Sequence, residues 1–100
     1  MSQLIQEQHE EIENIFTFAI YKDEKVGIID ELQYNRTQNT YRLFIKQGYM
    51  IPAEILNKLE KSKWKLNYIH AEEFVNYNKK PLPEIHVYLI VGLVPKMEGI

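Results

Sequence analysis

The chain has 100 residues, of which 45% are hydrophobic and 26% are charged, and its formal net charge is −2. These values are ordinary for one globular domain, so we expect residues 1–100 to bury a single core without metal or disulfide support. Because the chain contains no cysteine, disulfide scaffolds, thiolate zinc sites and thiol nucleophiles are excluded.

The longest apolar run is VYLIVGLV at residues 87–94. A membrane-spanning helix needs about 20 apolar residues, so this run predicts a buried strand instead. The first residues, MSQLIQEQHEE, carry acidic side chains where a secretory signal would carry basic ones, and no long apolar segment follows them. We therefore expect an intracellular chain that makes no contact with a membrane.

The first segment predicts a helix, because apolar and aromatic positions recur along one helical face. These positions are Ile5, His9, Ile12 and Phe16. The helix is expected to end near Asn14, where β-branched and aromatic residues become frequent, and a strand is expected over residues 15–22.

A polar turn, KDEK, should connect this strand to a second one over residues 26–32, so that the two form a hairpin. A polar loop, QYNRTQN, then leads to a third strand over residues 40–46. In that strand, apolar positions alternate with mixed ones: Tyr41, Leu43 and Ile45 on one face, and Arg42, Phe44 and Lys46 on the other.

A second helix is predicted within residues 51–63, where Pro52 suits a first helical turn. The short strand expected next, residues 64–70, should alternate so that one set of side chains faces the core: Trp64, Leu66 and Tyr68. Residues 71–83 are expected to form a long loop. The last strand, residues 84–94, is apolar on both faces, which is typical of a central strand.

The predicted order is therefore α-β-β-β-α-β-β. Strands joined by short turns, with helices that interrupt rather than alternate, indicate an α+β domain. We expect two helices and a mostly antiparallel sheet of about five strands.

The stretch KLEKSKWKLNY at residues 58–68 combines lysines with a tryptophan. Binary patterning of a helix and a half-buried strand accounts for most of it. If the second helix covers the Trp64 face, however, the opposite sheet face gathers basic and aromatic side chains from three strands. These candidate partner-binding residues are Arg42, Phe44, Lys46, Lys65, His86 and Tyr88, with Tyr34 and Tyr77 in asparagine-flanked loops.

Such a face has three possible occupants: the first helix or a second subunit, a protein partner, or single-stranded nucleic acid that stacks on its rings. Nucleic acid is the weaker expectation, because the isoelectric point is about 5.9 and phosphate binding depends on lysine and arginine.

Residues with catalytic potential form no recognisable arrangement. The four glycines are well separated, which excludes the usual nucleotide-binding loops, and the three histidines fall on three different elements. We expect no catalytic residue, no metal site and no cofactor.

Lysine outnumbers arginine ten to two, and isoleucine, asparagine and tyrosine are abundant. In this respect the chain resembles small orphan proteins of viruses or mobile elements with AT-rich genomes, such as archaeal viruses. The resemblance implies an accessory protein in a host cytoplasm.

We expect a small non-enzymatic binding protein that self-associates, for example as a homodimer, and contacts a protein partner through a sheet face or strand edge. A nucleic-acid-binding module is the alternative.

Overall fold

The computed structural model describes residues 3–22 and 24–97. It contains two helices and six strands. In chain order they are α1 (Gln3–Ile15), β1 (Thr17–Tyr21), β2 (Glu24–Gly27), β3 (Ile29–Asn35), β4 (Thr40–Ile45), α2 (Ala53–Lys61), β5 (Trp64–Asn76) and β6 (Glu84–Pro95). The predicted α+β class is confirmed, and the predicted order differs from the observed one by a single additional strand.

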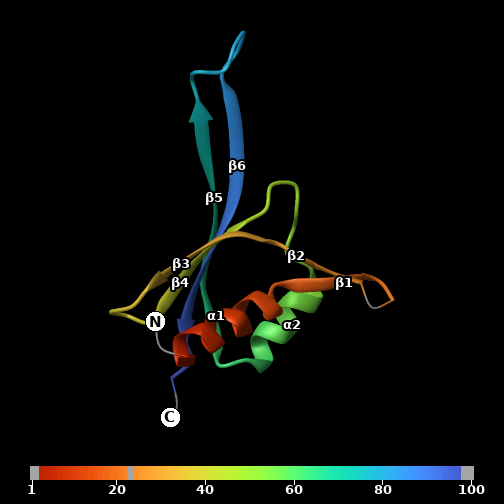
Figure 1. Cartoon of the computed structure of the whole chain (residues 1–100), viewed down its shortest axis with the longest axis vertical. Helices are drawn as coiled ribbons and strands as arrows, with labels where there is room; N and C mark the ends of the chain where they lie inside the picture. Colours follow the sequence, from red (N-terminus) through yellow and green to blue (C-terminus); the bar gives the residue numbers. More distant parts are fainter. Residues whose placement is uncertain (1–2, 23, 98–100) are drawn as a thin grey trace.

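Four of the strands form one antiparallel sheet in the order β3-β4-β6-β5, while β1 and β2 form a separate antiparallel hairpin. The apolar strand β6 is therefore central, as its two-sided hydrophobic pattern predicts. Figure 1 shows both helices in the lower body of the molecule, with the β1–β2 hairpin beside α2.

The core lies between the two helices and one face of the four-stranded sheet. Each helix contributes buried side chains to it, among them Ile12 and Ile55. The sheet contributes alternate residues of its strands, which stand on the same face because side chains alternate along a strand. The sheet residues in the core are Tyr41, Leu43, Ile45, Trp64, Val91 and Leu93. Trp64 is 1% exposed, so the prediction that it faces inward is confirmed.

Both helices cover this same face, which we call the inner face. The other face of the sheet, which we call the outer face, has no described helix packed on it. Cover of the outer face by the first helix was one of the alternatives that the sequence allowed, and the position of α1 excludes it, because its residues Ile12 and Ile15 belong to the inner-face core.

The strand predicted over residues 26–32 is in fact two strands. Its first part pairs with β1 and its second part with β4, and the chain changes sheet at Ile28. Ile28 is fully buried; its N–H donates to the carbonyl of Phe16 at 3.0 Å, and its own carbonyl accepts from Lys46 at 2.7 Å. The predicted hairpin is therefore correct, but its second strand is shorter than expected.

Two predicted loops are partly strand. Strand β3 continues to Asn35, and β5 continues through the segment AEEFVN to Asn76. The composition of these segments is polar, but each lies beside a partner strand that supplies its backbone hydrogen bonds, and pairing overrides local propensity. The connection between β5 and β6 is limited to residues 77–83.

The extension of β5 and β6 creates an arm, defined here as residues 71–89. The last paired residue of β6 toward β4 is Ile90, opposite Phe44, so beyond it β5 and β6 pair only with each other among the described strands. Figure 1 shows the arm rising far above the body, and the long dimension of the molecule is 56 Å.

A side-chain network joins α1 to the sheet near the β3–β4 turn. Gln8 donates to the Tyr41 hydroxyl at 3.0 Å and to Asn39 Oδ1 at 2.8 Å. Burial raises the pKa of the Tyr41 phenol above its ordinary value of 10.0, with Tyr34 and Glu11 acting in the same direction and the Gln8 hydrogen bond opposing them. The phenol therefore stays protonated near neutral pH and accepts the bond from α1.

Candidate functional site

The outer face of the sheet carries a cluster of aromatic rings from three strands. Phe44 lies on β4, Phe74 on β5 and Tyr88 on β6, and the ring centroids are 5.5 to 6.2 Å apart. These distances are typical of aromatic pairs that stabilise one another. We call these three residues the outer aromatic cluster.

Strand register explains why residues so distant in the sequence meet. Phe44 lies opposite Ile90, and Tyr88 lies opposite Glu72. Side chains of directly opposed residues stand on the same face of a sheet. The three rings of the cluster therefore all project from the outer face. Ile90 also lies on this face and is fully buried, although it is not part of the inner-face core.

Charged groups border the cluster. The Arg42 guanidinium lies 5.3 Å from the Phe44 ring centroid, and its Nη2 donates to Glu72 Oε2 at 3.1 Å. His70 Nε2 lies 3.6 Å from the same carboxylate oxygen. Because about 42% of both the Arg42 and the Glu72 side chain is exposed, this ion pair orients the guanidinium more than it stabilises the fold.

A second set of polar contacts, centred on His86, lies on the part of the outer face that belongs to the arm. His86 Nδ1 lies 2.9 Å from Gln47 Oε1, and its Nε2 contacts the carboxylate of Glu84. The His86 ring centroid is 6.4 Å from that of Tyr88. The loop after β4 is thereby joined to the arm through this imidazole.

Four of the predicted partner-binding residues come together on the outer face: Arg42, Phe44, His86 and Tyr88. Lys65 also lies on this face, opposite Val94, but four residues along β6 from Ile90 and therefore away from the cluster. Tyr77 lies in the connection at the tip of the arm and is 75% exposed. The predicted gathering of aromatic and basic side chains is thus found in part.

Two predicted residues lie elsewhere. Tyr34 is in strand β3 rather than in a loop, and its ring packs against His9 and Tyr41 on the inner side, where its hydroxyl donates to Asn39. Lys46 follows the last residue of β4 and lines a hollow together with Glu13 and Asp30. Neither residue has a recorded contact with the outer aromatic cluster among the described residues.

The sequence patterns did not identify four outer-face residues: Tyr68, His70, Glu72 and Phe74. The expected alternation placed Tyr68 beside Trp64 on the core side, which is wrong because a β-bulge at Asn67 inserts one extra residue between Leu66 and Tyr68. A bulge reverses the face of every later side chain. The length of the final apolar strand could have indicated that β5 continues to Asn76, because paired strands tend to match in length.

A hollow of about 670 Å³ lies at the end of the outer face opposite to the arm. Gly92 contributes to its floor, and the Tyr68 ring lies over this glycine: a Cβ atom there would be 2.1 Å from the ring. The described side chains around it include two arginines and several amides but no carboxylate; they include Gln33, Asn35, Arg36, Gln38, Arg42 and Asn67.

The described residues contain neither a cluster of metal ligands nor a membrane-spanning helix. Among them, no group of three or more His, Asp or Glu side chains is arranged to hold a metal ion, and no helix is long and apolar enough to cross a membrane. Comparison with protein-family models, with curated proteins and with solved structures finds no match to this chain.

Proposed function

We propose that this chain is a small non-catalytic binding protein that self-associates and contacts a protein partner through the outer face of its sheet. The observation that carries the proposal is the outer aromatic cluster, which stands partly exposed on a sheet face that no described helix covers. The abundance of lysine, isoleucine, asparagine and tyrosine suits an AT-rich genome, and the proposal therefore includes an accessory role in a virus or mobile element.

The cluster has the properties of an interface centre. Aromatic residues and arginine are enriched where proteins bind one another, because they bring large contact areas and lose little side-chain entropy. Here Phe44 and Tyr88 surround the buried Ile90, and Arg42 is oriented by Glu72. A partner would meet side chains that already hold their positions, which lowers the entropic cost of binding.

Replacement of Phe74 or Tyr88 by alanine is expected to weaken binding of the partner at least about tenfold, as truncation of a central interface aromatic does. Tagged wild-type and variant chains would be recovered from their native cells under conditions that preserve complexes. The protein that accompanies the wild type should be lost from both variants, and its affinity for purified chains should be measured by calorimetry.

The control is Tyr21→Ala, because Tyr21 is an aromatic residue, 64% exposed, that lies on β1, away from the outer face. Thermal unfolding identifies any variant that has lost its fold. Phe74, at 41% exposure, is the safer of the two positions in this respect. Recovery of the same protein by wild type, Phe74→Ala and Tyr88→Ala would contradict the proposal.

The hollow beside Gly92 favours a second candidate function, binding of single-stranded nucleic acid. Its two arginines and the Tyr68 ring offer phosphate contacts and a stacking surface, and no described carboxylate lines it. The alternative differs from the first proposal in the part of the outer face that it uses.

Oligonucleotide binding tests this alternative directly. Fluorescence anisotropy at two salt concentrations should show affinity that falls as salt rises, and Arg36→Ala should reduce the slope of log K against log salt by about 0.7, the value for one phosphate contact on a single strand. Lys25→Ala, on exposed β2, is the control. Absence of salt-sensitive binding would remove this candidate.

A further inference from the structure

No described helix or further strand covers the arm as a second layer. Among the described strands, its two halves pair only with each other beyond Ile90, and a lone two-stranded hairpin is marginally stable in water. On its inner side Leu89 is the last β6 residue that packs against the core. The part above Leu89 therefore exposes both its faces.

The inner side of the arm carries an apolar strip. Val75 and Ile85 are directly opposed, and Val87 lies opposite Glu73, so these four side chains share one face. The three apolar residues are 37%, 57% and 49% exposed for Val75, Ile85 and Val87 respectively. Because these aliphatic side chains adjoin one another, the strip differs from the singly scattered apolar residues that occur on any protein surface.

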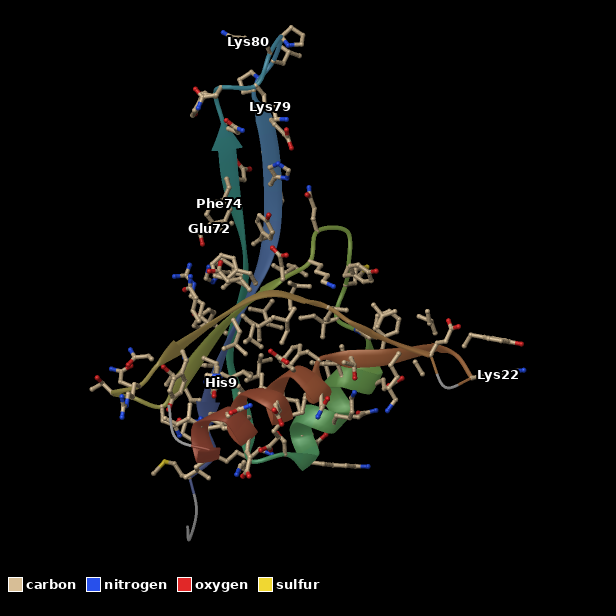
Figure 2. The ribbon with its side chains drawn as sticks, viewed as in Figure 1. His9, Lys22, Glu72, Phe74, Lys79 and Lys80 are labelled. Atoms are coloured by element: carbon tan, nitrogen blue, oxygen red, sulfur yellow. The ribbon has the colours of Figure 1, made fainter. Side chains whose placement is uncertain are left out.

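The charges of the arm are divided into paired and unpaired groups. Glu72 pairs with Arg42, and Lys79 pairs with Glu84 at 3.5 Å. Glu73 and Lys80, by contrast, form no ion pair with any described residue. Glu73 lies at the lower end of the apolar strip, whereas Figure 2 shows Lys80 at the far tip of the arm.

These two charges suit a symmetric contact. Along the arm, Val75 and Ile85 lie between Glu73, which is paired with Val87, and Lys80, which lies in the connection beyond the end of β5. When two copies of such a strip meet in antiparallel orientation about a two-fold axis, each contact occurs twice, as in any isologous interface. The glutamate of one copy then faces the lysine of the other at both ends.

We propose that the partner in self-association is a second copy of this chain, packed arm against arm in antiparallel orientation. Val75 and Ile85 of the two copies meet near the two-fold axis, Val87 adds to the apolar contact, and Glu73 of each copy pairs with Lys80 of the other. This inference rests on the self-association in the proposed function and gives it a geometry. Both outer faces stay free, so the dimer presents two binding surfaces and gains avidity.

Charge reversal tests the arrangement. Glu73→Lys and Lys80→Glu each place like charges across the interface, and each is expected to weaken the homodimer at least about tenfold. An equimolar mixture of the two variants should dimerise as well as the wild type, because all its cross-chain pairs again have opposite charge. Sedimentation velocity over a wide concentration range measures both effects.

The control is Lys25→Glu, a reversal of the same size on exposed β2, which should leave the dimer unchanged. Both arm positions are exposed, and circular dichroism verifies that the variants fold. Dimers of wild-type affinity in both single variants, or a mixture that fails to recover, would overturn the arm-to-arm packing and leave self-association standing. A wild type that stays monomeric throughout would overturn self-association itself, while partner binding through the outer face is decided separately by the Phe74→Ala variant.

Discussion

Replacement of Trp64 by alanine is expected to lower the free energy of unfolding by about 3–5 kcal/mol, the usual cost of deleting a large buried aromatic side chain. Trp64 is 1% exposed and packs edge-to-face on Tyr41 with ring centroids 5.2 Å apart. It begins β5 directly after α2, so its removal leaves a cavity where both elements join the core. Chemical denaturation followed by circular dichroism measures the change.

Two companion variants make this result interpretable. Trp64→Phe should cost less than Trp64→Ala, because it retains a ring and removes an indole N–H that is buried without a hydrogen-bond partner. Tyr77→Ala, at the exposed tip of the arm, should change stability by about 0.5 kcal/mol or less. A Trp64→Ala chain as stable as the wild type would contradict the inward orientation of the Trp64 side chain. The assignment of the other β5 residues to the inner and outer faces depends on that orientation.

Replacement of Ile90 by alanine is expected to cost about 2–5 kcal/mol, although Ile90 lies on the sheet face that no described helix covers. Its side chain is fully buried between the neighbouring strands' Phe44 and His70. The loss should appear as an early unfolding of the arm as well as a lower midpoint, because Ile90 is where the arm joins the body. Hydrogen exchange of β5 and β6 amides reports this directly.

The matched control for this variant is Ile20→Ala. Ile20 is the same residue type in another strand but is 54% exposed, so its truncation should cost about 0.5 kcal/mol or less. Equal stability of the two variants would mean that the outer aromatic cluster does not shield Ile90. The cluster would then be a set of separate surface rings rather than an organised contact surface.

The faces of the β6 residues show what strand alternation can predict. His86 and Tyr88 were expected to share one face of the last strand, and the structure places them on one face together with Ile90, whereas Val87, Leu89 and Val91 lie on the other. Period-two alternation depends only on local backbone geometry and survives wherever the strand is regular. The same rule failed at Tyr68, because the bulge at Asn67 is a property of the pairing with β6 and leaves no mark in the hydrophobic pattern.

Strand length is the second property that pairing decided. The segment AEEFVN has two adjacent glutamates and no clear alternation, and its composition suits a loop. In the structure it is strand, because β6 continues opposite to it and pairs with it from Glu84 to Leu89. Phe74 thereby joins Phe44 and Tyr88, so one of the three rings of the outer aromatic cluster depends on a strand segment that local propensity does not favour.

The sequence by itself determined the α+β class, the central position of the final strand, the burial of Trp64 and the aromatic character of the second sheet face. These features follow from periodicity and composition, which are local. Only the tertiary structure decided that both helices cover the inner face, that the chain changes sheet at Ile28, and that β5 and β6 extend into an arm. Each of these depends on contacts between segments far apart in the chain, and the free energy of such contacts is not encoded in any single stretch of residues.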